Sequence, residues 1–479
     1  MFVDRVADLE ELESRWGMKP QVYLLWGRRR VGKSALIRRF AAQRESVIYQ
    51  AVTGTITDQL SLLTRRIRAW REDPLLAAAP LANWEQAFAY LENAGRSRKA
   101  KGEPLLVVLD EIQYLHASDD TIISRLQEFL EVVKHDDLPL FLIVSGSSIS
   151  FFEEKILIGT VFGRRTAGGL LRPLTYRDAA QFFPEWTPAD QVRAWAVLGG
   201  MPYYLEQFDP RRSLEWNIRE RMLLRNQVLY NEAELLLREE LRDAPTYQSV
   251  LAAVAEGQTK NADIANRSGV APNHLSTILT RMERLHLVER TVPFGEDAAS
   301  SKRGLWTVLD NYLAFWFAFV RPNLTELEAG RGDAIWRDEI KPALDRFVSK
   351  PAFERLCRDY VRSAIGRDAT LPAHGDVGEW WGPYTARNPE GRMVTEQRQA
   401  DIVVGTAKRV SLVGECKWSD ALVDADALRQ LRIAAAAVPG THASTRLALF
   451  ARNGFTDRVR AVAEQEGIRL FTASDMLAD

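Results

Sequence analysis

The amino-acid sequence predicts an α/β protein of several domains, with a helix-covered parallel sheet in its N-terminal part. Three observations lead to this prediction. Short apolar runs alternate with amphipathic stretches over the first part of the chain, as in strands joined by crossover helices. A mostly helical segment follows, and the C-terminal part is rich in strands again. A chain of 479 residues has room for about two to four domains.

The first elements form a strand, loop and helix unit. A helix is expected from Val6 to Arg15, a strand from Gln21 to Trp26, and a second helix from Lys33 after a glycine-bounded loop. Further strands are expected in three later apolar runs: Ser46 to Ala51, Pro104 to Leu109 and Leu138 to Ser145. We therefore predict an α/β core over residues 1–175 and a helical subdomain over residues 176–243.

The middle of the chain has the pattern of a winged helix-turn-helix, which we assign to residues 244–322. Two short helices precede a third that Asn273 is expected to cap and that reaches Leu287. Two strands then flank a polar loop from Gly295 to Gly304, which would be the wing. A charged linker around Glu326 to Asp333 is the expected boundary before the last domain.

The C-terminal domain, residues 340–479, is predicted to be a separate mixed α/β domain. It opens with an amphipathic helix from Ala352 to Ala364 and continues with strands around Trp380, Ala400 to Val404 and Val410 to Cys416. A helix, a strand, a helix and a strand then alternate up to Thr472.

Composition excludes several classes of protein. The 63 Lys and Arg residues nearly balance the 64 Asp and Glu residues, so no overall field attracts the chain to nucleic acid or an anionic membrane, and such binding must be local. The apolar run from Tyr312 to Val320 is too short to span a bilayer, so no membrane partner is expected. The two cysteines, Cys357 and Cys416, are too few for a disulfide framework and fit a cytoplasmic protein.

A phosphate-binding loop is the strongest motif in the sequence. The segment Gly27-Arg-Arg-Arg-Val-Gly32-Lys33-Ser34 follows a predicted strand and opens a predicted helix, which is the context that a P-loop requires. Its backbone amides would hold phosphates, Lys33 would reach the β- and γ-phosphates, and Ser34 would ligate Mg²⁺. ATP with Mg²⁺ is the expected ligand, and the residues predicted to bind it here are Gly27, Arg28, Arg29, Arg30, Val31, Gly32, Lys33, Ser34 and Ala35.

Two further strand ends complete the predicted nucleotide site. Asp110 and Glu111 follow a buried apolar run; Asp110 would hold Mg²⁺ and Glu111 would orient or deprotonate the attacking water. Ser145 ends the next run and could sense the nucleotide, although small polar residues also simply end strands. Arg164 and Arg165 are candidates for stabilising transition-state charge, in the same chain or across a subunit contact, and are otherwise solvated loop arginines.

These residues make the chain similar to the archaeal-type P-loop ATPases of the STAND branch of the AAA superfamily. The resemblance rests on six segments: Phe2 to Leu12, Gly27 to Ser34, Leu109 to Leu115, Ser145 to Ser147, Phe162 to Arg165 and Leu198 to Pro202. It implies that Gly200 and Pro202, in a helical subdomain that serves as a lid, lie near the base or sugar of the nucleotide. The aromatic stretch from Trp306 to Phe317 resembles the segment that follows the winged helix in that family.

The C-terminal domain resembles the PD-(D/E)XK nuclease fold, a restriction-endonuclease-like domain that is often attached to these ATPases. If the runs around Asp401 and Glu415 pair as a hairpin, their carboxylates meet at one end of the sheet, and Lys417 projects on the same face as Glu415. Two carboxylates suit Mg²⁺, and Lys417 could orient the nucleophile. The resemblance adds Glu354 as an auxiliary metal ligand. The alternatives are a non-cleaving relic of the fold and a coincidental pair of surface strands.

The sequence also leaves the partner of the winged helix open. Its third helix would present polar and basic side chains to a DNA groove: His274, Ser276, Thr277, Thr280, Arg281 and Arg284. Basic and acidic residues nearly balance in this segment, however, and a structural or protein-contacting role is the alternative.

The expected function is an ATPase that switches the position of the winged helix and the nuclease-like domain and acts on DNA or RNA by Mg²⁺-dependent phosphodiester cleavage. The alternative is a non-cleaving regulatory or signalling ATPase whose C-terminal fold docks a partner. A homo-oligomer or a protein partner is compatible with both.

Overall fold

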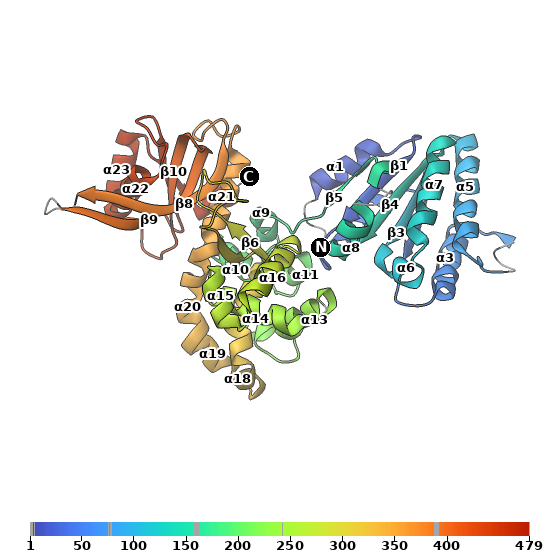
Figure 1. Ribbon diagram of the computed structural model, residues 1–479, viewed down its shortest axis with the longest axis horizontal. Helices are drawn as coiled ribbons and strands as arrows, with labels where there is room; N and C mark the ends of the chain where they lie inside the picture. The colour runs from blue at the N-terminus through green and yellow to red at the C-terminus, as the bar shows by residue number, and fades with distance from the viewer. Residues whose placement is uncertain are drawn as a thin grey trace. The chain divides into compact units, whose positions relative to one another are not determined.

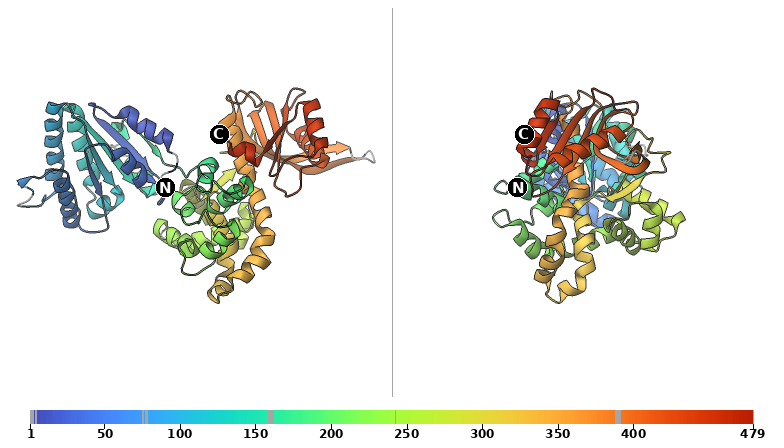
Figure 2. Two further views of the ribbon diagram at one scale, coloured as in Figure 1. Left: turned by 180° about the vertical axis from the view of Figure 1, so that it is seen from behind. Right: turned by 90° about the vertical axis from the view of Figure 1, so that its left-hand side faces the viewer.

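The computed structural model describes residues 3, 5–74, 76, 79–157, 162–241, 243–387 and 392–478. The chain divides into two compact units, which can be followed in Figures 1 and 2. The N-terminal unit comprises residues 1–174 and 201–203, and the C-terminal unit comprises residues 175–200 and 204–479. Among the helices that the structure describes, none combines the length and the apolar character needed to cross a bilayer.

A five-stranded parallel sheet in the order β2-β3-β4-β1-β5 forms the centre of the N-terminal unit. Its strands are β1 (Gln21–Trp26), β2 (Ser46–Gln50), β3 (Leu105–Asp110), β4 (Leu140–Gly146) and β5 (Ala167–Leu170). Every residue of β3 and β4 is buried, as expected of parallel strands covered on both faces. The predicted parallel sheet is confirmed.

The helices of this unit pack on the sheet through apolar faces. They are α1 (Val6–Arg15), α2 (Lys33–Ala41), α3 (Ile56–Trp70), α5 (Trp84–Lys101), α6 (Ile112–Ser118), α7 (Ile122–His135) and the short α8 (Ile149–Phe151). Side chains from β1 to β4 and from α3, α5, α6 and α7 share one apolar core, in which Phe88 stacks on Phe129. The start of α3 is fixed by a capping box between Thr55 and Asp58.

The C-terminal unit begins with the helical segment that the sequence predicts. Its helices are α9 (Tyr176–Ala180), α10 (Pro188–Leu198), α12 (Leu214–Met222) and α13 (Val228–Glu240). The short helix α11 (Pro202–Leu205) begins in the N-terminal unit and ends in the C-terminal unit. The aromatic segment that follows β7 packs among these helices. The Tyr312 hydroxyl donates to the carbonyl of Leu229 at 2.8 Å, and the Trp316 indole donates to the carbonyl of Tyr230 at 2.6 Å.

Three helices and an antiparallel strand pair form the middle of the chain: α14 (Ala244–Ala255), α15 (Asn261–Ser268), α16 (Pro272–Arg284), β6 (Val288–Thr291) and β7 (Leu305–Val308). This is the predicted order of elements, but Asn273 does not cap the third helix. Ala271 holds the N-cap position and Pro272 is the first helical residue, because the fixed φ of proline favours that place.

The prediction of a charged linker around Glu326 to Asp333 is wrong. The chain there forms α18 (Leu324–Glu328) and α19 (Gly332–Ile335), which bury Leu327 and Ile335 despite the surrounding charges. They belong to a helical run that also contains α17 (Asn311–Phe315), α20 (Lys341–Phe347) and α21 (Glu354–Ala364), joined by the helical turns Trp316–Val320, Arg321–Asn323, Trp336–Ile340 and Val348–Phe353. Figure 1 shows this run as a column of helices.

A second five-stranded sheet, in the order β12-β11-β10-β9-β8, ends the chain. Its strands are β8 (Asp376–Arg387), β9 (Met393–Thr406), β10 (Arg409–Lys417), β11 (Arg446–Ala451) and β12 (Arg469–Thr472), with helices α22 (Ala425–Ala437), α23 (Asp457–Glu466) and α24 (Ala473–Leu477). The pairs β8–β9 and β9–β10 are antiparallel, whereas β10–β11 and β11–β12 are parallel. The predicted mixed α/β domain is confirmed.

Candidate functional site

The loop between β1 and α2 has the backbone shape of a phosphate cradle. Gly27, Arg30 and Gly32 adopt positive φ angles of 154°, 69° and 101°. A Cβ atom on Gly27 would lie 2.6 Å from the carbonyl oxygen of Leu171, so this position needs glycine. The helix α2 begins at Lys33, and its N-terminal amides face the same end of the sheet as the loop.

Lys33 and Ser34 bring the loop to the end of β3. The buried Lys33 ammonium donates to the carbonyls of Gly27 at 2.8 Å and Arg28 at 3.1 Å. The Ser34 hydroxyl donates to the Asp110 carboxylate at 3.1 Å. The hydroxyl of Ser145, at the end of β4, donates to the other oxygen of Asp110 at 2.5 Å. The start of α2 and the end of β4 therefore converge on the carboxylate at the end of β3.

Burial raises the pKa of Asp110, and the nearby Glu111 acts in the same direction, whereas the hydrogen bonds from Ser145 and Ser34 and the charge of Lys33 lower it. An oxygen-rich environment of this kind suits Mg²⁺, which proteins bind through one or two carboxylates together with hydroxyl, phosphate and water oxygens. The donor set of Ser34 and Asp110 therefore fits the predicted ion.

Glu111 is held by Ser147 and Gln113, which lie in two segments of the resemblance but are not among the predicted site residues. Its carboxylate accepts hydrogen bonds from the backbone amide of Ser147 at 3.0 Å, from the Ser147 hydroxyl at 2.6 Å, and from the side-chain amide of Gln113. Glu111 itself adopts a positive φ of 58° at the start of α6. The signal for Ser147 was present in the sequence, since it follows Ser145 by two positions at the same strand end.

The three arginines of the loop point to different partners. Arg28 is buried, Arg29 donates to the hydroxyl of Tyr114, and the Arg30 guanidinium lies 4.2 Å from the centre of the Tyr203 ring. Val31 is buried, and its carbonyl accepts a hydrogen bond from Arg5 at 2.8 Å. These contacts connect the loop to the start of α1, to α6 and to the residues around Tyr203.

The remaining predicted nucleotide-site residues are placed as follows. Ala35 lies in the first turn of α2, and Pro202 is the nearest side chain to Gly32 outside the loop, 3.8 Å from the position a Cβ would take there. Gly200 is buried in the C-terminal unit. Phe2 and Asp4, which belong to the first segment of the resemblance, lie outside the described residues.

Of the two candidate transition-state arginines, Arg164 ends a short 3₁₀ turn and forms an ion pair with Glu131 on α7. Its hydrogen bond lowers the pKa of Glu131. Arg165 follows it in the chain before β5.

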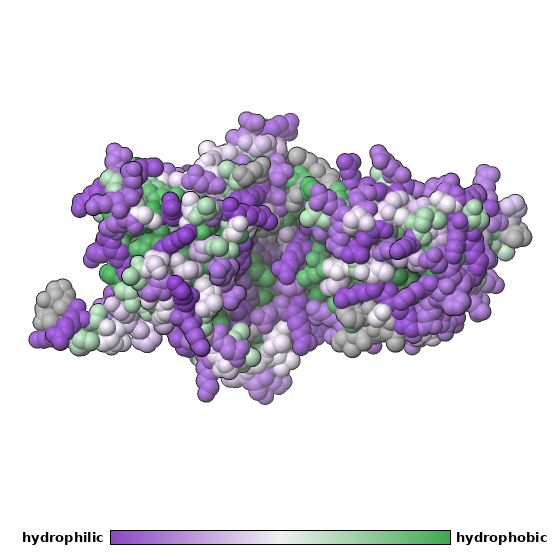
Figure 3. Space-filling model, turned by 90° about the horizontal axis from the view of Figure 1, so that it is seen from above, coloured by the Kyte–Doolittle hydropathy of each residue, from purple (hydrophilic) through white to green (hydrophobic). Residues whose placement is uncertain are grey.

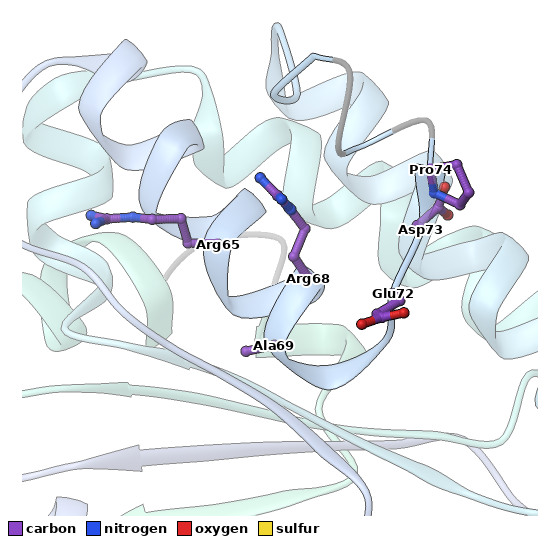
Figure 4. Close-up of a pocket in the computed structure, with 6 residues that line it drawn as sticks. All are labelled: Arg65, Arg68, Ala69, Glu72, Asp73 and Pro74. Atoms are coloured by element: carbon purple, nitrogen blue, oxygen red, sulfur yellow. The ribbon is translucent and has the colours of Figure 1, made fainter.

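A separate pocket of 570 Å³ opens at the C-terminal end of α3 (Figure 4). Figure 4 shows Arg65 and Arg68 projecting from the helix, while Glu72, Asp73 and Pro74 come from the segment that follows it. Two basic and two acidic side chains line this pocket, and it shares no residue with the loop after β1.

The acidic residues of the C-terminal domain meet as the hairpin geometry requires. β9 and β10 pair with Ile402 opposite Gly414, so Asp401 and Glu415 lie next to this pair. The Asp401 carboxylate accepts a hydrogen bond from the backbone amide of Cys416 at 2.9 Å, and Lys417 donates to Glu415 at 2.8 Å. The expected juxtaposition of the two strands is therefore present.

Glu354 on α21 completes this carboxylate cluster. Burial first, and the charge of Asp401 second, raise the pKa of Glu354 to about 8. Burial likewise raises the pKa of Asp401 and Glu415. Lys350 lies 3.6 Å from Glu354 and donates to Gln399 at 2.9 Å, and Gln399 in turn donates to Asp401 at 3.1 Å.

Within the described ranges, no three His, Cys, Asp or Glu side chains converge closely enough to hold a metal ion together. Glu354, Asp401 and Glu415 are thus not a preformed three-carboxylate cage. Mg²⁺ commonly uses one or two carboxylates and keeps several waters, so Asp401 with Glu415 fits this ion without the third acid.

The segment predicted to be a wing contacts the C-terminal sheet. The amide of Phe294 donates to the carbonyl of Glu379 at 2.7 Å, and Arg303 donates to the carbonyl of Trp381, both on β8. In contrast, His274, Thr277, Arg281 and Arg284 on α16 are exposed. The predicted wing therefore contacts the edge strand β8 at Glu379 and Trp381. The polar face of α16 is exposed to solvent.

The comparisons with known proteins agree with the geometry of the N-terminal unit. Residues 2–208 match the model of an ATPase domain found predominantly in Archaea. The match contains every residue that we predict at the nucleotide site. Residues 316–430 match a second model, described as archaeal and bacterial proteins of unknown function.

Among individual proteins, an uncharacterized protein of Methanocaldococcus jannaschii is 27% identical over 387 residues, which are 80% of this chain and 82% of that protein. The Walker-type ATPase of Pyrococcus abyssi shares 19% identity with a TM-score of 0.46, covering 66% of this chain and 96% of its own. The ORC2 protein of Aeropyrum pernix, in its ADPNP–ADP complexes, shares 16% identity with a TM-score of 0.42, covering 68% and 96%.

Proposed function

We propose that this protein binds ATP with Mg²⁺ at the loop after β1 and hydrolyses it. The observation that carries this proposal is the convergence of Ser34 and Ser145 on the buried carboxylate of Asp110, directly beside Lys33. Strand ends of a parallel sheet are where such sheets bind ligands, and the match to an ATPase domain supports nucleotide as that ligand.

In the proposed reaction, Lys33 leaves the carbonyls of Gly27 and Arg28 and binds the β- and γ-phosphates of ATP. Ser34 and Asp110 would hold Mg²⁺, which neutralises phosphate charge when it is bound. Glu111 orients a water molecule and accepts its proton as the water attacks the γ-phosphorus and the bond to the ADP oxygen breaks. Ser147 and Gln113 position Glu111 for this task. Arg164 and Arg165 remain candidates for stabilising the developing charge.

The chain offers a route by which nucleotide binding can affect the C-terminal unit. Residues 201–203 belong to the N-terminal unit, whereas their neighbours on both sides belong to the C-terminal unit. Pro202 lies beside Gly32, and Tyr203 packs on Arg30. A change in the loop on binding ATP would thus pass along the backbone into α10 and α11. This supports the proposed switch, in which the nucleotide repositions the winged helix and the C-terminal domain.

The C-terminal domain has a second proposed activity, Mg²⁺-dependent cleavage of a phosphodiester in nucleic acid. The hydrogen-bonded arrangement of Asp401, Glu415 and Lys417 on adjacent strands favours it. Asp401 and Glu415 would hold the ion, which lowers the pKa of a bound water, and Lys417 would orient that water. The alternative is a regulatory ATPase whose C-terminal fold docks a partner without cleaving it.

One experiment separates these proposals. The purified full-length protein is incubated with ATP and Mg²⁺, with and without DNA or RNA, and both phosphate release and strand cleavage are measured. Phosphate release that Lys33→Ala abolishes supports the ATPase, and unchanged release in that variant overturns it. Turnover of ATP with intact nucleic acid in all conditions supports the docking alternative.

A further inference from the structure

The strands β8 and β9 extend beyond the rest of the C-terminal sheet as a two-stranded ribbon. β10 pairs with β9 from Thr406 to Ile402, whereas the pairing of β8 with β9 continues as far as Arg387 opposite Met393. Figure 1 shows the ribbon projecting from the sheet. The ribbon therefore starts at the carboxylate cluster and leads away from it.

One face of the ribbon is continuous with the carboxylate cluster. The amide of Gln399 donates to Asp401, which places these two side chains on the same face. Strand side chains repeat every two residues, so Gln397 and Thr395 follow on that face. Their partners on β8 are Pro383 and Thr385, and the hydroxyls of Thr385 and Thr395 lie 2.8 Å apart. We name this side of the ribbon the track face.

The two faces of the ribbon differ in exposure. On the track face, Pro383, Thr385, Thr395 and Gln397 are all exposed. On the other face, Ala386 and Val394 are half-buried, Tyr384 packs against the apolar core of the domain, and only Glu396, which pairs with Arg398, is exposed among the described residues of the two strands. The track face is thus the more exposed side of the ribbon.

The chemistry of the track face suits a nucleic-acid duplex. Its polar groups are neutral hydroxyls and amides and the exposed Arg387, which lies opposite the exposed Met393, and between Gln399 and Arg387 its described part holds no carboxylate. Lys350, which donates to Gln399 and pairs with Glu354, lies at its base. Figure 3 shows mainly hydrophilic and neutral residues on the projecting ribbon. Hydroxyl, amide and guanidinium groups are the usual contacts to phosphates and base edges.

The shape of the ribbon distinguishes a duplex from a single strand. Two paired strands fit the major groove of a duplex, which is about 12 Å wide. Proteins that hold single strands rely on several aromatic side chains for stacking. Apart from Trp381 at its base, the described part of the track face has no aromatic residue.

We propose that the track face docks double-stranded nucleic acid and aligns it with Asp401 and Glu415. This inference rests on the proposed cleavage of phosphodiesters and identifies the substrate of that reaction as a duplex. Thr385, Thr395, Gln397 and Arg387 bind the duplex, and none of them takes part in bond breaking.

The test is binding of a labelled DNA duplex to the full-length protein in EDTA, which prevents Mg²⁺-dependent cleavage. The variant Thr385→Glu/Thr395→Glu adds two carboxylates to the track face at one cross-strand pair. The matched control, Ala386→Glu/Val394→Glu, adds the same two charges to the neighbouring pair on the other face. We expect the first variant to weaken duplex binding at least about tenfold and the control to weaken it no more than about twofold.

Equal binding by both glutamate variants, or tighter binding of single-stranded than of double-stranded DNA, would overturn the docking proposal. Melting curves of each variant show whether the fold is intact. Duplex binding that depends on the track face, without cleavage after Mg²⁺ is added, supports docking and rejects the cleavage part of the proposed function. Cleavage that the track-face variant leaves unchanged supports cleavage and rejects docking.

Discussion

The two candidate sites both place carboxylates at strand ends, but they surround them differently. At the end of β3, Asp110 is matched by the hydroxyls of Ser34 and Ser145 and faces Lys33. In β9 and β10, Asp401 and Glu415 lie near a third acid, Glu354. Burial first, and the charge of Asp401 second, raise the pKa of both Glu354 and Glu415.

The difference shows how each site accommodates buried negative charge. The first site relies on fixed hydrogen-bond donors and on a lysine next to the loop. The second site groups three acids with Lys350 and Lys417, and a bound cation would relieve the repulsion among the acids. The experiments below test this contrast, from the largest expected effect to the smallest.

Lys33→Ala should abolish ATP turnover, with a loss of about 10³-fold, because the ammonium is the charge nearest to the transferred phosphoryl group in the proposed complex. Phosphate release by the purified protein measures this. Arg39→Ala, an exposed residue on the same helix, is the control and should turn over ATP normally. Equal rates in the two variants would contradict the assignment of the loop.

Asp401→Asn should abolish Mg²⁺-dependent cleavage of nucleic acid, by about 10²-fold or more, and leave ATP turnover unchanged. Lys417→Ala should do the same. Removing Mg²⁺ with EDTA should stop both cleavage and ATP turnover, whereas each of these two substitutions should stop cleavage alone. The measurement is strand cleavage and phosphate release in the same reaction. Cleavage that persists in both variants would place the activity elsewhere.

Ser147→Ala should slow ATP turnover about tenfold while leaving nucleotide affinity near the wild-type value, because the hydroxyl positions Glu111 and is not expected to contact phosphate. Comparing the turnover rate with the affinity for a labelled nucleotide separates the two effects. Ser150→Ala, on the adjacent helix α8, is the control. A loss of nucleotide binding equal to the loss of turnover would contradict a positioning role.

Glu289→Gln tests the scaffold of the second site. Arg355, next to Glu354 on α21, donates to Glu289 on β6 at 2.9 Å. Burial raises the pKa of Glu289, but the charge and hydrogen bond of Arg355 outweigh burial and hold it below its ordinary value of 4.5. The ionised carboxylate therefore stabilises the fold above pH 4.5, and this contribution is lost as the pH falls through the lowered pKa.

We expect the variant to be less stable than the wild type by about 1 kcal/mol at neutral pH, with a difference that shrinks on acidification below pH 4.5. Denaturant unfolding at several pH values measures it. A difference in the free energy of unfolding that is independent of pH would show that the ion pair is not its cause.

The first site could be predicted from sequence more completely than the second, because its residues are contiguous or follow long apolar strands. Gly27 to Ser34, Asp110 and Ser145 each stand at the end of such a strand, and the parallel topology brings these ends together. Ser147 was missed because a serine at a strand end also has a purely structural explanation. The left-handed turn at Glu111 that directs the carboxylate to Ser147 has no sequence signal of its own.

In the second site, the hairpin and the positions of Asp401 and Glu415 followed from strand alternation, but the length of the ribbon did not. β9 begins at Met393. Its first residues include Thr395, Glu396 and Gln397, and this polar run lacks the apolar alternation that would have predicted a strand. The linker prediction failed for the opposite reason. The charges around Glu326 suggested a boundary, whereas Leu327 and Ile335 bury enough apolar surface to hold two short helices in place.

The assignment of residues 201–203 to the N-terminal unit determines how the protein can be dissected. A fragment that ends at Leu174 lacks Pro202 and Tyr203, which lie beside Gly32 and Arg30 in the intact chain. Cutting the polypeptide at the first crossing between the units would thus remove part of the wall of the nucleotide loop. Activity measured on such a truncated fragment would describe an incomplete enzyme, so single substitutions in the whole chain are the sounder way to assign roles to each half.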